Sequence, residues 1–285
     1  MADQPQTTDP AVLAQDAAMR NFPSHGEPLI HTINWIGLST LYMKEVRRFF
    51  KVQTQTIWAP AITTLLFLVI FTVAMGREGR MVLGVNFATF VAPGLIVMGM
   101  MQNAFANSSS SLIQSKITGN IVFVLLPPIS YLEFFMAYLV AALIRGFTVG
   151  VGVLLVGLFF TDMEMRHPLW ILTFAFASGA VFACVGIMAG IWANQYDNLA
   201  AVQNFLVMPL TFLSGVFYSI HSLPDFWQAV SRGNPVFYMI DGFRYGFFGQ
   251  GDVDPWLSLA VVAPFAFILA LFTLMMLRSG YKLRH

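Results

Sequence analysis

Charged side chains are scarce in this chain. They make up 10% of its 285 residues, while hydrophobic residues make up 57%. An average soluble domain carries roughly 25% charged residues, so this composition excludes an ordinary soluble globular protein. The net charge is only +1, so no basic surplus points to nucleic acid, and we predict no nucleic-acid partner.

Cysteine and the motifs of common enzymes are missing as well. The single cysteine, Cys184, can form no disulfide within the chain and belongs to no cluster of metal-binding residues, so we predict no metal site. The metalloprotease pattern H-E-x-x-H and the nucleophile pattern G-x-S-x-G are absent. We therefore predict that the chain has no catalytic residues and is not an enzyme.

No energy source is visible in the sequence. No glycine is followed by lysine, which excludes the phosphate-binding loop G-x-x-x-x-G-K-[ST]. No acidic residue lies in the middle of an apolar stretch, where an ion-driven carrier usually needs one. An ion-driven secondary transporter, or an intramembrane enzyme that modifies lipids, therefore stays only an alternative interpretation.

Long apolar stretches are what the chain has instead. Six of them, separated by short polar loops, cover Ile57–Met75, Phe87–Ala106, Tyr131–Phe160, Leu169–Ala193, Leu199–Ser219 and Trp256–Leu277. A helix needs roughly 20 residues to cross a bilayer, and each stretch is about that long. The sequence thus predicts an all-α polytopic membrane protein with six transmembrane helices.

The distribution of basic residues predicts the orientation. Because six spans return the chain to its starting side, both termini share one side of the membrane. If that side is the cytoplasm, it holds nine basic residues outside the spans and the outer side holds five, as the positive-inside rule requires. Met1–Asn34 is polar and lacks the pattern of a signal peptide, so we interpret residues 1–34 as a disordered cytoplasmic tail.

Two further segments are apolar without being spans. Residues 35–55 form a basic amphipathic pattern, with Lys44, Arg47 and Arg48 on one helical face, which indicates a helix lying in the membrane interface. This helix can serve as a lipid anchor, as a docking surface for a cytoplasmic partner, or as both. Residues 222–251 are rich in aromatic residues but interrupted by prolines, which favours a re-entrant helical hairpin in the outer leaflet.

Three charged residues stand out within the apolar segments of the chain. Asp241 and Arg244 are three residues apart in the hairpin and can pair on one helical face, where we expect them to act as an outer gate. Arg145 lies inside the third apolar stretch. It must face protein or water, either bound to a carboxylate or to backbone carbonyls, or in contact with an anionic group of a substrate.

The order of these features resembles a known family. The resemblance is carried by Lys44–Phe49 followed by Pro60, the segments Phe90–Leu95 and Asn103–Asn107, the loop Leu125–Ser130, the segment Gly215–Ser219, and Asn234–Pro235 with Asp241–Arg244. Together these segments are similar to the permease subunits of ABC-2 type (type V) exporters. The resemblance covers residues 35–285. Within the family it is strongest to the bacterial YadH-like and NodJ-like permeases, which carry no fused ATPase.

The resemblance implies a function and partners. Such a permease exports amphiphilic cargo (a lipid, a lipid-linked saccharide or a drug) across the bacterial inner membrane. It works as a homodimer in contact with membrane lipids. ATP and magnesium are bound by a separate cytoplasmic ABC ATPase, and the permease itself needs no cofactor.

The resemblance also assigns roles to residues. The amphipathic helix and a cytoplasmic coupling loop at residues 108–126 would contact the ATPase, the loop through an apolar stripe. The expected ATPase-coupling residues are Lys44, Arg47, Arg48, Leu112, Ile113, Lys116 and Ile117. The expected substrate path runs between the second and fifth spans and is lined by Met98, Met101, Gln102, Phe105, Asn204, Met208, Thr211 and Phe212.

Overall fold

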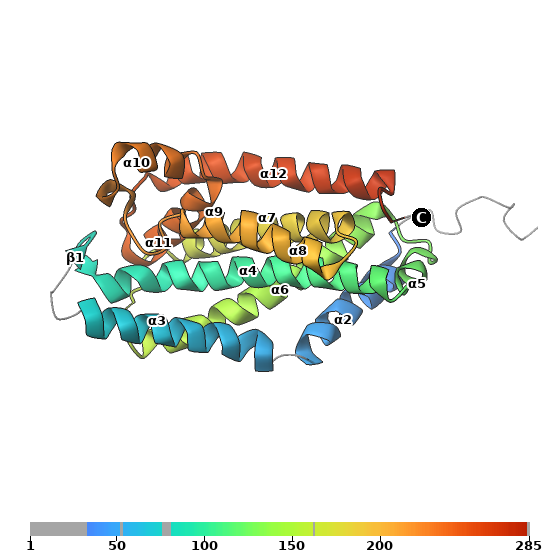
Figure 1. Ribbon diagram of the computed structural model, residues 1–285, viewed down its shortest axis with the longest axis horizontal. Helices are drawn as coiled ribbons and strands as arrows, with labels where there is room; N and C mark the ends of the chain where they lie inside the picture. The colour runs from blue at the N-terminus through green and yellow to red at the C-terminus, as the bar shows by residue number, and fades with distance from the viewer. Residues whose placement is uncertain (1–32, 52–53, 76–80, 162, 284–285) are drawn as a thin grey trace, which may run out of the picture.

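The computed structural model describes residues 33–51, 54–75, 81–161 and 163–283, so the predicted tail lies almost entirely outside the described residues. The helices run side by side in an elongated bundle (Figure 1). Their bounds are α2 Trp35–Lys51, α3 Ala59–Met75, α4 Phe87–Ile117, α5 Ile121–Leu125, α6 Tyr131–Leu158, α7 Pro168–Trp192, α8 Tyr196–Val202, α9 Met208–Phe212, α10 Asp225–Arg232, α11 Pro235–Phe248 and α12 Pro255–Ser279.

Four of the helices are long and apolar enough to cross a membrane. They are α4, α6, α7 and α12, and each contains most of one predicted span. The pair of helices Trp35–Lys51 and Thr56–Phe71 passes the same test together but is bent by 75°, which makes a fifth candidate. The described part of the chain is thus an all-α polytopic membrane protein with four or five candidate spans.

The fifth predicted span, Leu199–Ser219, does not form one helix of that length. It is made of α8, a π-helical turn at Gln203–Val207 and the short α9, which ends at Phe212. Proline at position 209 cannot donate a backbone hydrogen bond, and beyond the end of α9 the turn contains Gly215, which takes a left-handed φ of 76°. The helical path of this segment therefore ends seven residues before the predicted end of the span at Ser219.

Helix α4 extends eleven residues further than the predicted span, which ends at Ala106. Ser108 and Ser109 donate hydrogen bonds to the carbonyls of Ala104 and Phe105, at 3.2 and 2.7 Å, so their hydroxyls are satisfied inside the helix. The predicted cytoplasmic loop at residues 108–126 is consequently helical as far as Ile117, and the short α5 follows.

A small β-hairpin joins α3 to α4 and was not predicted. Strands β1 (Met81–Val82) and β2 (Val85–Asn86) pair antiparallel. Leu83 and Gly84, between them, both take a positive φ, of 48° and 75°, as a tight two-residue hairpin turn requires.

The segment 222–251 forms two helices, α10 and α11, joined at Gly233–Asn234. Asn234 fixes the turn: its side-chain oxygen accepts a hydrogen bond from the Val236 nitrogen at 3.0 Å, and its amide donates to the Leu210 carbonyl at 2.7 Å. Helix α11 packs against α7, α12 and α4, which buries most of its aromatic residues. How deeply the two helices enter the membrane stays a prediction.

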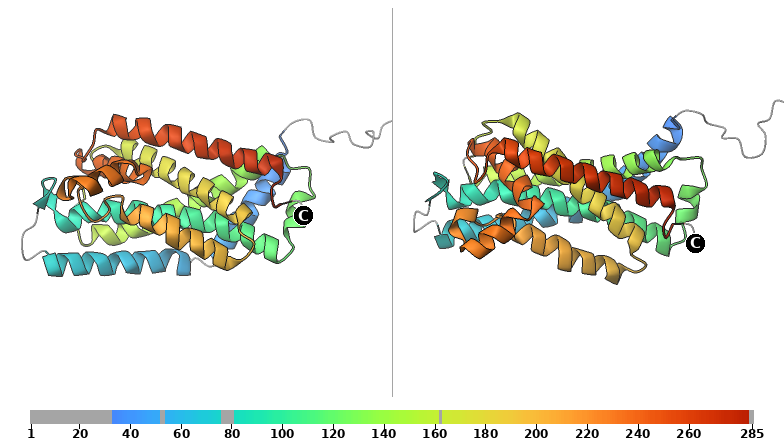
Figure 2. Two further views of the ribbon diagram at one scale, coloured as in Figure 1. Left: turned by 45° about the horizontal axis from the view of Figure 1, so that its top comes forward. Right: turned by 90° about the horizontal axis from the view of Figure 1, so that it is seen from above.

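The core of the bundle is the contact of α4 with α6 and α7. Small residues let these helices approach closely: Gly186 lies against Ser108 and Phe105, and Gly190 lies against Leu112 and Ser109. Helices α3 and α12 flank this core from opposite sides (Figures 1 and 2). The polar residues that line the site described next therefore sit on a tightly packed frame.

Candidate functional site

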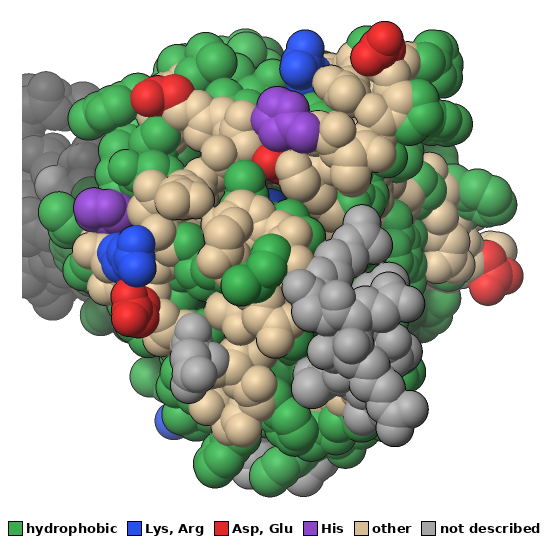
Figure 3. All heavy atoms as spheres, turned by 90° about the vertical axis from the view of Figure 1, so that its left-hand side faces the viewer, with side chains coloured by type: hydrophobic (Ala, Val, Ile, Leu, Met, Phe, Trp, Pro, Cys, Tyr) green, Lys and Arg blue, Asp and Glu red, His purple; other side chains and the backbone are tan. Residues whose placement is uncertain are grey.

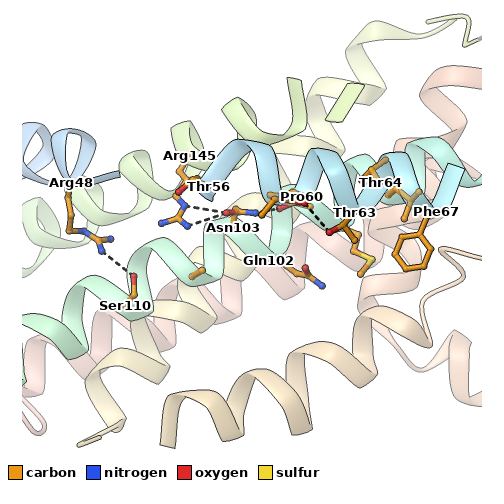
Figure 4. A pocket seen from close by; sticks show the side chains of 15 residues that line it. Arg48, Thr56, Pro60, Thr63, Thr64, Phe67, Gln102, Asn103, Ser110 and Arg145 are labelled. Carbon is orange, nitrogen blue, oxygen red and sulfur yellow. Dashed lines mark hydrogen bonds between the residues drawn. The ribbon is translucent and has the colours of Figure 1, made fainter. Parts of the chain in front are cut away.

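A pocket of about 550 Å³ opens beside α4, between α3 and α6, with the end of α2 at its rim (Figure 4). Its lining residues are Arg48, Thr56, Ala59, Pro60, Thr63, Thr64, Phe67, Leu95, Met98, Gly99, Gln102, Asn103, Ala106, Ser110 and Arg145. Thr56 and Asn103 are buried while Ala59 and Thr63 are exposed, so the pocket reaches from the surface into the bundle.

Arg145 is the charged group inside this pocket. Its Nε and Nη2 atoms donate to one oxygen, Oδ1 of Asn103, at 3.4 and 3.2 Å. Asn103 is oriented for this contact because its own amide donates to the Gly99 carbonyl at 3.0 Å. None of the ion pairs among the described residues includes Arg145, so no carboxylate neutralises it there.

Arg48 is the second arginine of the pocket, and it joins α2 to α4. It donates to the Asn107 carbonyl at 2.7 Å and to Ser110 Oγ at 3.2 Å, and it pairs with Glu45 at 3.3 Å. Glu45 is completely buried and accepts a hydrogen bond of 2.7 Å from Ser111. These polar contacts fasten the amphipathic helix to the span beside it.

The structure exposes some of the predicted ATPase-coupling residues and buries others. Lys44, Arg47 and Ile117 are exposed, but Leu112 and Ile113 are completely buried in the bundle. Arg48 points to α4, and Lys116 donates to the carbonyls of Ile191 and Ala193 at 2.7 and 2.6 Å. Leu112 and Ile113 are therefore not part of an exposed apolar stripe, because the helix that carries them continues inside the bundle.

Exposed apolar side chains occur a little further along the chain. Ile117, Val122, Phe123 and Leu126, at the end of α4 and around α5, are between 50% and 72% exposed. They lie at the same end of the bundle as α2 and the C-terminus (Figure 1). Sequence reasoning included Ile117 and Val122 in the expected stripe, and docking of an ATPase there stays a prediction.

The residues of the predicted substrate path also differ in location and exposure. Met98 and Gln102 line the pocket, and the Nε2 atom of Gln102 is buried without a hydrogen-bond partner. Met101, Phe105 and Thr211 are buried in the core, whereas Asn204 and Phe212 are exposed and Met208 is half-buried. Within one chain these residues do not form a continuous surface.

The opposite end of the bundle contains the expected ion pair. Arg244 and Asp241 lie 3.9 Å apart between Nη1 and Oδ1, and both side chains are 1% exposed. Arg244 also donates to the Gly215 carbonyl at 2.7 Å and stacks 3.9 Å above the Phe90 ring. Asp241 accepts from the backbone nitrogens of Asp252 and Val253 at 2.8 and 2.9 Å.

Seen from this end, the surface carries few charged side chains, and they are scattered among apolar ones (Figure 3). In the described ranges, no three His, Cys, Asp or Glu side chains gather closely enough to hold a metal ion. The pocket between α3, α4 and α6 is therefore the strongest candidate for a binding site.

Sequence reasoning missed the partners that complete the pocket. Asn103 and Ser110 were unremarkable polar residues in or beside an apolar stretch, and Glu45 was one charge among several. One signal was present: an arginine in a span needs a polar partner on a neighbouring helix.

Comparisons with known proteins agree with this architecture. A family model described as ABC-2 type transporter matches residues 37–248, and the chain belongs to this family. It is 34% identical over 250 residues to the inner membrane transport permease YadH of Escherichia coli K12, which covers 88% of this chain and 98% of that protein. Nodulation protein J of Rhizobium meliloti is 21% identical, over 82% of this chain and 89% of its own length.

A shorter match has a more specific name. The capsule polysaccharide export inner-membrane protein BexB of Haemophilus influenzae is 31% identical over 77 residues, 27% of this chain and 26% of that protein. The protein is therefore the multi-pass permease subunit of an ABC-2 type transporter in the inner membrane. It is a non-catalytic transport subunit, and an ATPase partner is implied by the family.

Proposed function

We propose that the protein is one half of a homodimeric exporter that moves amphiphilic cargo outward. ATP and magnesium act in a separate cytoplasmic ATPase, while this chain forms the path through the membrane. Both termini lie in the cytoplasm, and α3 and the α8–α9 segment complete six spans in the membrane. Helices α10 and α11 form the re-entrant hairpin on the outer side.

The observation that carries this proposal is the group of exposed apolar residues at one end of the bundle. Ile117, Val122, Phe123 and Leu126 are exposed beside a polar turn, at the same end of the bundle as the basic helix α2. Burying a large apolar side chain yields roughly 1.5–3 kcal/mol, so this surface gains considerably from a protein partner. Lys44 and Arg47 are exposed on α2 and are available to the same partner.

The cargo class rests on the pocket and on the relatives. The pocket has a polar part at Asn103 and an apolar part at Phe67 and Leu95, which suits a molecule with a polar and an apolar end. The name of one relative refers to the export of capsule polysaccharide. A lipid, a lipid-linked saccharide and an amphiphilic drug all have this two-part character.

The test uses the chain co-expressed with an ABC ATPase of its own organism. We expect the two proteins to co-purify, and we expect Ile117→Glu and Phe123→Glu to abolish cargo-stimulated ATP hydrolysis, because each places a charge in an apolar contact. Met81→Glu is the matched control, since Met81 is 69% exposed at the opposite end of the bundle. Hydrolysis that stays coupled in both variants would show that this surface does not contact the ATPase.

A further inference from the structure

The charge balance of the pocket is one-sided. Its described lining contains two arginines, Arg48 and Arg145, and no carboxylate. Glu45 pairs with Arg48 from outside the lining, whereas among the residues that the structure describes Arg145 is hydrogen-bonded only to the neutral Asn103. A guanidinium group has five N–H donors, and two nitrogens of Arg145 share a single oxygen. Arg145 therefore keeps donors for a ligand.

The remaining polar groups add donors. Gln102 lines the pocket, and its buried Nε2 atom has no hydrogen-bond partner among the described residues. The Thr56 and Thr64 side chains are buried in the pocket wall. Buried polar groups are normally hydrogen-bonded, so donors without partners in a pocket indicate what it binds. A group rich in acceptors and negative in charge satisfies both the charge and the free donors.

The two ends of the pocket differ in character. Arg48 and Arg145 lie toward the α2 end, and Phe67 lies at the other end (Figure 4). Leu95 and Met98 of α4 are further apolar lining residues. Arg145 is the fifteenth residue of α6, so it lies about 21 Å along the helix from Tyr131, at 1.5 Å per residue. An elongated ligand can thus place a charged head among the arginines and an apolar chain toward Phe67.

We propose that this pocket binds the anionic headgroup of an amphiphile, a phosphate group attached to an apolar chain, with Arg145 as its principal charge partner. The inference rests on the proposed function, because it names the class of cargo that the permease carries. Arginine suits this ligand since its planar fork can form two parallel hydrogen bonds with a phosphate. Basic pockets between transmembrane helices on the cytoplasmic side are known to bind anionic lipid headgroups.

The experiment measures binding to the purified full chain without any ATPase, so its result is independent of the co-purification that tests the proposed function. Three probes are titrated in dodecyl maltoside: dodecyl phosphate, inorganic phosphate and dodecyltrimethylammonium. The readout is the ligand-dependent rise of the thermal unfolding midpoint, fitted to one site. We expect dodecyl phosphate to bind saturably, and the other two probes to bind far more weakly.

Variants then locate the site. Arg145→Gln should weaken dodecyl phosphate binding about tenfold or more, the loss expected for a charge-assisted contact, and Arg145→Lys should recover part of it. Thr63→Phe fills the pocket from an exposed position on α3 and should weaken binding with no change in charge, which keeps the test valid if Arg145→Gln fails to fold. Arg232→Gln, at an exposed arginine of α10 outside the pocket, is the matched control and should bind like the unmodified chain.

Specific results would overturn the proposal. If both Arg145→Gln and Thr63→Phe bind dodecyl phosphate as the unmodified chain does, the pocket is not its site. If inorganic phosphate binds as tightly as dodecyl phosphate, the ligand is free phosphate and not an amphiphile. If dodecyltrimethylammonium binds equally well, the pocket recognises an apolar chain without regard to charge.

Discussion

At the residue scale, the pair of Asp241 and Arg244 shows that backbone contacts determine which of the two positions carries the negative charge. If charge attraction alone held the pair together, exchanging the two charges would restore part of the interaction that a single substitution removes. The structure predicts no such rescue, because Asp241 accepts from two backbone N–H groups and Arg244 donates to a backbone carbonyl. A reversed pair would place donors against donors and an acceptor against an acceptor.

We expect Asp241→Ala and Arg244→Ala each to destabilise the protein by on the order of 3–5 kcal/mol, since each leaves a buried charge without its partner. The doubly reversed variant should be no more stable than either. The measurement is the thermal unfolding midpoint in detergent, together with transport. Glu164→Ala is the control: Glu164 pairs with Arg166 at 3.1 Å but is exposed, so its loss should change stability by less than about 1 kcal/mol.

If the single variants unfold like the unmodified chain and still transport cargo, the pair is not the outer gate. If they keep their stability but lose transport, Asp241 and Arg244 act in the transport cycle and not in folding.

At the scale of single elements, the contact between α4 and α7 depends on glycine. A side chain at Gly186 would collide with the Ser108 hydroxyl and the Phe105 backbone carbonyl. Backbone cannot move aside as a flexible side chain can, so we expect Gly186→Ala to destabilise the bundle by about 1–3 kcal/mol.

The matched control for Gly186→Ala is Gly99→Ala on α4. A Cβ atom at Gly99 would lie 3.7 Å from Val149 and Val153, which is ordinary contact. Because alanine favours a helix over glycine by up to about 1 kcal/mol, this variant should be as stable as the unmodified chain or more so. Equal unfolding midpoints for the two variants would show that α4 and α7 can separate without loss of stability.

The elements also show what the sequence reveals and what it does not. Length and hydropathy predicted the helices α6, α7 and α12 because an apolar run of span length has few other stable conformations. They missed the continuation of α4 through Ser108–Ser111, since serines that bond to their own helix and to a neighbour are indistinguishable in sequence from serines in water. They also extended the fifth span through residues 213–219, where apolar character continues but the backbone turns.

The site was predictable only in part, for a related reason. Arg145 was visible because an arginine within an apolar run is rare. Its partner Asn103 lies 42 positions earlier, so the contact depends on how α4 and α6 pack. Sequence predicted that Arg145 needs a partner, and tertiary structure supplied the identity of that partner.

At the scale of the whole molecule, the α8–α9 segment leaves an apolar face uncovered. Phe205 is 84% exposed, Leu206 48% and Phe212 43%. We expect this face to meet the same face of a second copy in the homodimer. Mass measurement in mild detergent should show two copies of the chain.

A single-cysteine design can locate this contact. Cys184 is buried, so a new exposed cysteine should be the main reactive thiol. We expect Phe205→Cys to give a cross-linked dimer with a short bismaleimide. Phe267→Cys, at a residue of α12 that is 69% exposed, should not cross-link. Cross-linking at Phe267 but not at Phe205 would place the dimer contact on another face.

The fastening of α2 to α4 has a consequence for how the protein is made. Glu45 is completely buried, and its partner Ser111 follows 66 positions later in the chain. At 5–20 residues per second, about 3 to 13 seconds of synthesis separate the two. During that interval the Glu45 carboxylate has no burial site, so α2 must wait at the water-facing boundary of the bilayer. Helix α2, which is synthesised before α4, therefore reaches its final position only after α4 has been inserted.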